Sequence, residues 1–113
     1  LVNAPLIVIL FWLETRGLGL LNALAPPPLI ALGVSIIALD LAWYVTHRAM
    51  HAVAGLWRYH AIHHSDLFVD ATTTIRQHPG EGLIRIVFLA AFSAPLGVSP
   101  EAFALYRAIT AVY

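Results

Sequence analysis

Five of the six histidines of this 113-residue chain lie between His47 and His64. They form two groups, His47-x3-His51 and His60-x2-His63-His64. Residues three or four positions apart lie on one face of a helix, so each group can direct its imidazoles to one side. Neutral imidazole binds iron, zinc, copper and nickel, and five imidazoles exceed what one tetrahedral zinc requires. The spacing therefore predicts a metal centre, with a pair of metal ions as its natural occupant.

Two helices are expected to position these rings, one carrying the first histidine group and a second covering residues 56–64. Gly55 lies between them and is expected to let the chain fold back, so that all the rings meet around one pocket. Two irons with open coordination positions would bind and activate O2 there. A purely structural role for all of these histidines is the less favoured interpretation at this spacing.

Two further polar residues are candidates for the same centre. Asp40 lies seven residues before His47, on the same predicted helix face. A carboxylate in a membrane-spanning stretch costs about 2.5–3.5 kcal/mol on insertion scales, so Asp40 should have a partner. That partner is either the second N–H of a ligand histidine or a group on a neighbouring helix. His78 stands before Pro79, and three roles are open for it: metal ligand, partner of a ligand, or helix cap.

The composition places these residues in a lipid environment. The chain is 60% hydrophobic and 11% charged, whereas an average soluble domain is about 25% charged. A single small core would not use that much apolar surface, so the remainder is expected to face a bilayer. The formal net charge of zero argues against nucleic acid as a partner, because phosphate binding needs a basic face. No cysteine is present, which limits metal ligands to His, Asp and Glu.

The predicted fold class is all-α: a multi-span transmembrane helical bundle with a histidine-rich helical cap on the cytosolic side. Residues 1–113 are expected to form a single, incomplete membrane domain. Within it, 28–46 is the best transmembrane helix, starting at a proline triplet, 47–81 is the histidine-rich region, and 83–113 is a membrane hairpin. Four arginines on the histidine side predict that this side faces the cytoplasm; they are Arg48, Arg58, Arg76 and Arg85.

The stretch 40–81 resembles the fatty acid hydroxylase superfamily, which includes sterol desaturases and alkylglycerol monooxygenases. The matching motifs are HRAMH, LWRYHAIHHS and RQHPGE. The resemblance implies a membrane-bound di-iron enzyme that uses O2 and an external electron donor to hydroxylate or desaturate a lipid of the sterol, fatty-acyl or alkylglycerol type. The family's ligands map to His47, His51, His60, His63 and His64, and Glu81 matches a recurrent acid. The family also carries a third histidine cluster, which we expect beyond Tyr113 in a longer protein.

Two other functions compete with this interpretation. A membrane metal transporter or metal-binding protein would also place histidines near a bilayer. Transport sites usually lie at the midplane on interrupted helices, whereas the histidines here gather at one end of the predicted span. A non-catalytic remnant of the oxygenase fold is the other alternative. Histidines alone do not distinguish iron from zinc, so zinc is a possible occupant of the centre.

Overall fold

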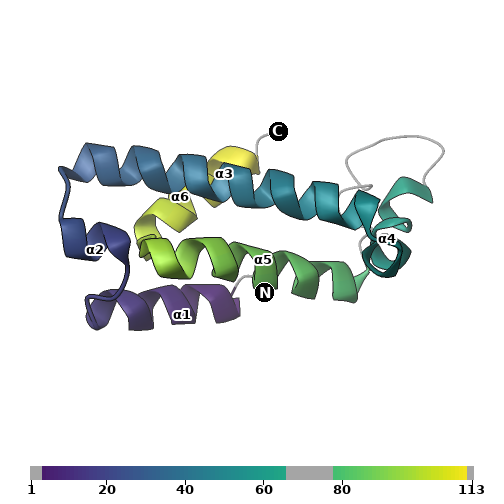
Figure 1. Ribbon diagram of the computed structural model, residues 1–113, viewed down its shortest axis with the longest axis horizontal. Helices are drawn as coiled ribbons and strands as arrows, with labels where there is room; N and C mark the ends of the chain where they lie inside the picture. Colours follow the sequence, from purple (N-terminus) through teal and green to yellow (C-terminus); the bar gives the residue numbers. More distant parts are fainter. Residues whose placement is uncertain (1–3, 66–77, 112–113) are drawn as a thin grey trace.

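The computed structural model describes residues 4–65 and 78–111, and every element in these ranges is a helix. The all-α prediction is confirmed for this part of the chain. The elements are α1 (Ala4–Thr15), α2 (Leu20–Leu24), α3 (Pro28–Ala52), α4 (Ala54–His60), the 3-10 turn η1 (His63–Ser65), α5 (Pro79–Leu96) and α6 (Pro100–Thr110) (Figure 1). Residues 66–77 of the predicted histidine-rich region lie outside the described ranges.

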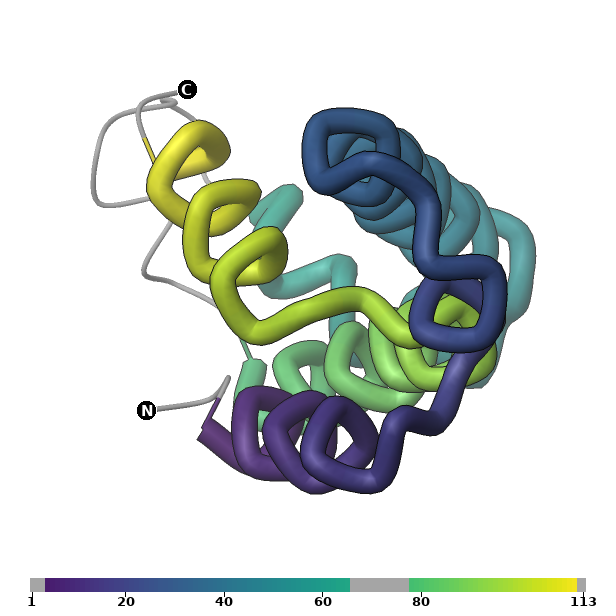
Figure 2. The backbone as a smooth tube through the Cα atoms, turned by 90° about the vertical axis from the view of Figure 1, so that its left-hand side faces the viewer, coloured from purple at the N-terminus to yellow at the C-terminus, as the bar shows by residue number. Residues whose placement is uncertain are grey.

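The long helices α3 and α5 run antiparallel, and α4 lies at one end of the bundle (Figure 1). Viewed along the bundle, α5 lies between α1 and α3, while α6 packs against α3 and α1 (Figure 2). The core is a set of apolar side chains shared by α1, α3, α5 and α6: Leu6, Leu10, Leu39, Ala42, Leu89, Val98, Ala102, Phe103 and Tyr106. This packing fixes the ends of α3 and α5 next to each other.

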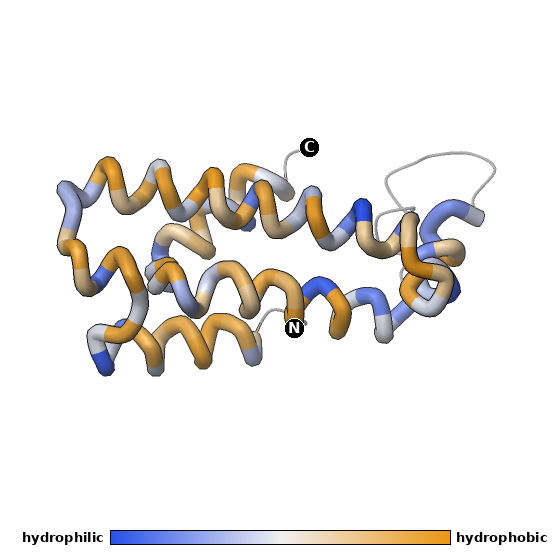
Figure 3. The backbone as a smooth tube through the Cα atoms, in the orientation of Figure 1, coloured by the Kyte–Doolittle hydropathy of each residue, from blue (hydrophilic) through white to orange (hydrophobic). Residues whose placement is uncertain are grey.

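Three segments are long and apolar enough to cross a membrane: Ala4–Leu24, Pro28–Ala52 and Pro79–Leu96. The first is interrupted between α1 and α2, so only the other two are single helices. Large apolar side chains point outward from them, with Leu29 80%, Ile37 70% and Leu83 63% exposed. Such exposure is unfavourable in water and expected in lipid. Hydrophobic residues dominate the bundle, and hydrophilic ones gather near α4 and the start of α5 (Figure 3).

Proline begins three of the helices. Pro28, Pro79 and Pro100 stand in the first turns of α3, α5 and α6. The missing proline N–H would have no helical partner there, and its fixed φ suits the helix. At the start of α6, the Ser99 hydroxyl accepts a hydrogen bond from the Ala102 N–H at 3.2 Å. These prolines therefore mark the starts of the three helices, including α3, which carries His47 and His51.

The break between α3 and α4 lies at Val53, not at Gly55 as expected. Val53 has an extended backbone (φ −105°, ψ 114°), a conformation that its β-branched side chain favours. Gly55 lies inside α4, and a Cβ there would meet nothing within 4 Å. The prediction that Gly55 provides the reversal was therefore wrong.

The second predicted helix, 56–64, is also shorter than expected, because α4 ends at His60. The next histidines lie in the 3-10 turn η1. Both the backbone N–H and the hydroxyl of Ser65 donate to the Ile62 carbonyl, at 3.2 and 2.7 Å. These i to i−3 contacts tighten the chain into a 3-10 turn. His60 and His64 consequently come from two elements rather than from one helix face.

Two glycines hold the opposite end of the bundle together. A Cβ built on Gly19, between α1 and α2, would lie 2.3 Å from the Cα of Gly97, between α5 and α6. Both residues have positive φ, 111° and 75°, which L side chains rarely adopt. The two chain reversals can touch only because neither residue carries a side chain.

Candidate metal centre

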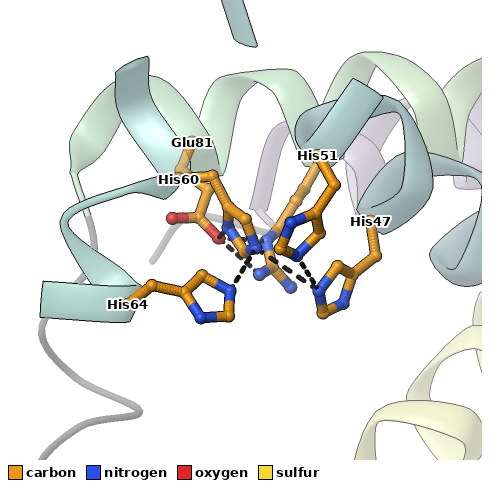
Figure 4. A network of polar contacts seen from close by, with 6 residues as sticks. His47, His51, His60, His64 and Glu81 are labelled. Carbon is orange, nitrogen blue, oxygen red and sulfur yellow. Dashed lines mark hydrogen bonds and ion pairs between the residues drawn. The ribbon is translucent and has the colours of Figure 1, made fainter. Parts of the chain in front are cut away.

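Four histidine rings meet where α3, α4 and η1 converge. His47 and His51 come from the last turns of α3, His60 from the end of α4, and His64 from η1 (Figure 4). One ring nitrogen of each lies within 4.8 Å of the others, so this group could hold a metal ion. His60 is fully buried, His47 is half-buried, and the other two rings are exposed. The break at Val53 brings the first histidine group against the second.

Three neighbouring pairs of these nitrogens are spaced as ligands of one metal ion would be. The Nε2 atoms of His47 and His51 lie 2.9 Å apart, those of His47 and His60 3.3 Å, and those of His60 and His64 3.1 Å. Metal–imidazole bonds of about 2.0–2.1 Å put neighbouring ligand nitrogens about 2.9–3.4 Å apart, depending on coordination geometry. The donor set and its spacing therefore fit a metal ion that prefers imidazole.

A buried carboxylate orients one of these rings. Oε1 of Glu81, in the first turn of α5, lies 3.0 Å from Nδ1 of His60, and both side chains are fully buried. An ionised carboxylate only accepts hydrogen bonds, so His60 donates from Nδ1 and a neutral ring keeps its lone pair on Nε2. That lone pair faces His47 and His64. A carboxylate behind a metal-binding histidine fixes its tautomer and ring orientation in this way.

Glu81 is itself held by Arg85 and, through Arg85, by Trp43. Both Nε, at 3.1 Å, and Nη2 of Arg85 donate to Oε1 of Glu81. The guanidinium carbon of Arg85 lies 3.9 Å from the centroid of the Trp43 ring on α3. Neither Arg85 nor Trp43 was predicted from the sequence to belong to the site. The four-residue spacing of Glu81 and Arg85 on a helix was the available signal for Arg85.

Desolvation and neighbouring rings keep His60 and His64 in the form that binds metal. Desolvation lowers the pKa of His60, although the hydrogen bond from its ring to Glu81 opposes that effect. Desolvation also lowers the pKa of His64, and the neighbouring His51 and His63 lower it further. Both rings are therefore neutral near pH 7, and neutral imidazole is the metal ligand.

His63 lies beside the four rings, but its nitrogens are not among the converging set. Its ring centroid is 5.6 Å from that of His60 and 5.4 Å from that of His64. Nδ1 of His63 is buried and has no hydrogen-bond partner within residues 4–65 and 78–111; the same holds for Oε2 of Glu81. Such buried unpaired atoms are uncommon. Beside a cluster of imidazoles they fit a site that receives a further group.

The remaining candidates lie away from the four nitrogens. Nδ1 of His78 accepts a hydrogen bond from the Gly80 N–H at 2.9 Å, so His78 acts as the N-cap of α5. The Asp40 carboxylate faces the hydroxyl of Tyr106 on α6. That contact joins two helices, and the orienting role considered for Asp40 stays a prediction.

A cavity of about 650 Å³ follows the face of α3 that carries the first histidine group. Its volume is within the usual range of small-molecule sites, about 300–1,000 Å³. It is lined by Asp40, Trp43, Tyr44, His47, Arg48, His51 and Ala52. A molecule in this cavity would contact aromatic rings and reach two of the four histidines.

Comparison with known proteins agrees with the histidine motifs. The family model described as fatty acid hydroxylase matches residues 32–113. This range contains the four converging histidines, Glu81, Arg85 and Trp43. No solved structure matches the chain. The family resemblance predicted from the motifs is confirmed.

Proposed function

This chain belongs to the fatty acid hydroxylase family, and we propose that it is an O2-dependent oxygenase that hydroxylates or desaturates a lipid at a non-haem iron centre. One observation carries the proposal: the converging Nε2 atoms of His47, His51, His60 and His64, with a buried carboxylate behind His60. Four neutral imidazoles directed at one place repel each other's lone pairs unless a proton or a cation lies between them. A metal ion satisfies all four.

We assign two irons to the site, held by the four converging histidines together with His63. Nδ1 of His63 is buried and has no hydrogen-bond partner among the described residues, which supports adding this fifth ring. When bound, the irons supply the activation of O2 that C–H oxidation requires. Zinc would suit the same imidazoles, so the metal found in a purified sample depends on supply. Electrons are expected from an external donor.

The residues of the chain have separate tasks around this centre. Glu81 keeps the Nδ1 proton on His60 and thereby presents Nε2 of that ring to the metal. Complete burial of His60 and Glu81 shields their contact from water and strengthens it. Two of the converging rings, His51 and His64, are exposed and leave the centre open to reactants. The site is thus shielded from water on the side of His60 and Glu81 and accessible on the side of His51 and His64.

A lipid substrate fits the surroundings of the histidines. The cavity along α3 places Trp43 and Tyr44 beside His47, and aromatic surfaces bind hydrocarbon chains well. The long helices expose apolar side chains, so we place the protein in a bilayer with the histidines at one membrane surface. The arginines near this end, including Arg48 and Arg58, support assigning that surface to the cytoplasmic side.

Metal content and lipid oxidation test the proposal together. Full-length protein, purified in detergent and reconstituted in vesicles, should carry about two irons per chain and consume O2 when supplied with a reductant and a lipid substrate. His60→Ala should lose iron and oxidation, whereas Arg58→Gln, at an exposed position on α4, should retain both. Metal uptake into vesicles without O2 consumption would favour a transporter. Absence of any bound metal would indicate a non-catalytic relative.

A further inference from the structure

We propose that Arg85 and Trp43 are positioning residues for the metal centre: together they clamp Glu81, and through Glu81 they fix the ring of His60. This inference rests on the proposed function, because it assumes that the histidines bind metal. It adds two residues that the histidine motifs do not include. Neither residue offers a ligand to the metal; both act through the carboxylate.

The contact between Arg85 and Glu81 restricts the carboxylate. Two guanidinium nitrogens donate to the same oxygen, Oε1, that accepts from Nδ1 of His60. The planar guanidinium fork imposes a direction on its acceptor that a lysine ammonium would not. Glu81 is fully buried, and Arg85 is 9% exposed, so solvent does little to weaken the contact. The position of Oε1, and with it the tilt of the His60 ring, therefore depends on Arg85.

Trp43 in turn restricts Arg85. The guanidinium stacks 3.9 Å from the ring centroid, a distance at which a cation is attracted to an aromatic face. An arginine side chain has several rotatable bonds, and stacking on one face limits the orientations of its fork. The two donor nitrogens are thereby aimed at Glu81 before the metal arrives.

The clamp also connects the two histidine groups. Trp43 lies four residues before His47 on α3, and residues at this spacing share a helix face. Arg85 and Glu81 lie on α5, and His60 ends α4. The path from Trp43 through Arg85 and Glu81 to His60 therefore sets the separation of His47 and His60, whose Nε2 atoms lie 3.3 Å apart. The separation of two ligands determines which coordination geometry a metal can adopt.

A merely structural ion pair would stabilise the fold without affecting metal binding. The chain offers a matched control, since the guanidinium of Arg16 lies 5.5 Å from the ring centroid of Trp12 on α1. Both of these residues are exposed, and α1 contributes no ring to the histidine cluster. Removing this second arginine–tryptophan pair should leave metal binding unchanged.

The test is a titration of metal-free, full-length protein in detergent with Co2+, recording both the dissociation constant and the visible spectrum of the bound ion. Arg85→Gln should weaken Co2+ binding about tenfold, in the range seen when groups that orient metal ligands are removed. Trp43→Leu should weaken binding several-fold and shift the Co2+ spectrum, and Trp43→Phe should largely restore both. The double variant should bind about as weakly as Arg85→Gln alone, because the two residues act in series. Arg16→Gln and Trp12→Leu should bind like the wild type.

Unchanged affinity and spectrum in folded Arg85→Gln and Trp43→Leu variants, even with lowered melting temperatures, would overturn the inference and leave the pair a structural one. If His60→Ala loses Co2+ while Arg85→Gln retains it, the inference fails and the proposed metal centre stands. If the wild type binds no Co2+, both fail. Should Arg85→Gln not fold, Arg85→Lys replaces it, because it keeps the charge but lacks the fork. Arg85→Lys should then show weakened binding, and wild-type affinity in it would contradict the clamp.

Discussion

Oε1 of Glu81 lies 3.0 Å from Nδ1 of His60, although 21 residues separate them in the chain. The contact joins the first turn of α5 to the last residue of α4. It makes the histidine cluster a product of tertiary packing, because the two residues come from helices that face each other across the bundle end.

Glu81→Gln should weaken metal binding about 10- to 100-fold with little loss of helix content. The glutamine can still accept from Nδ1 of His60 through its carbonyl, but it lacks the charge that Arg85 pairs with. Iron content of the purified full-length protein measures the effect. Glu101→Gln is the matched control, since Glu101 is an exposed acid in the first turn of α6. Equal iron content in the two variants would argue against an orienting role for Glu81.

His63→Ala should abolish both iron binding and lipid oxidation, if this ring completes the metal pair. The structure leaves its buried Nδ1 without a hydrogen-bond partner among the described residues, which is the basis for the expectation. Iron stoichiometry and O2 consumption are the two measurements. Retention of one iron with loss of oxidation would show that His63 serves one metal of the pair. Full activity would remove His63 from the ligand set.

Metal affinity should begin to fall at a lower pH than it would if the ligands had the pKa of free histidine. Protons compete with metal for imidazole, and desolvation lowers the pKa of His60 and His64 below the ordinary value of about 6.5. The Co2+ dissociation constant should thus change little from pH 8 to about pH 6.5 and rise below that. In the metal-free protein, the unfolded chain takes up protons first, so stability should decline as pH falls through about 6.5. Loss of half of the bound Co2+ at a pH above 6.5 would contradict this expectation.

Gly19→Ala should lower the melting temperature strongly. The added Cβ would overlap the Gly97 backbone at 2.3 Å, and φ at Gly19 is 111°. Overpacking typically costs about 1–3 kcal/mol, and the backbone strain adds to that. Gly33→Ala is the control, since a Cβ there meets nothing within 4 Å on a helical backbone; it should be neutral or stabilising. Similar melting temperatures for the two variants would mean that the glycine contact does not support the fold.

The composition was enough to predict an all-helical membrane bundle, and the three sequence motifs carried the resemblance to the family. These features depend on local sequence: the proline triplet sets the start of α3, and a four-residue spacing places His47 and His51 together. The reversal was predicted at Gly55, which lies inside α4. The break lies at Val53, and residue type does not specify it, because Val45 lies inside α3.

The site's supporting residues were less predictable than its ligands. Trp43 was not assigned to the site from the sequence, and Arg85 was interpreted from its residue type alone as a determinant of membrane orientation. Their contact depends on how α3 and α5 face each other, which no spacing within either helix specifies. His78 had three open roles, and the choice of helix cap became clear only once α5 was seen to begin at Pro79.

The contact between Gly19 and Gly97 and the buried carboxylate of Glu81 lie at opposite ends of α5. This helix has 18 residues and is about 27 Å long at the rise of an α-helix. An α-helix changes little in length when force acts along its axis, so the two ends of α5 move together. A shift of α5 along its axis, caused by a methyl group added at Gly19, would therefore also displace Glu81 relative to His60.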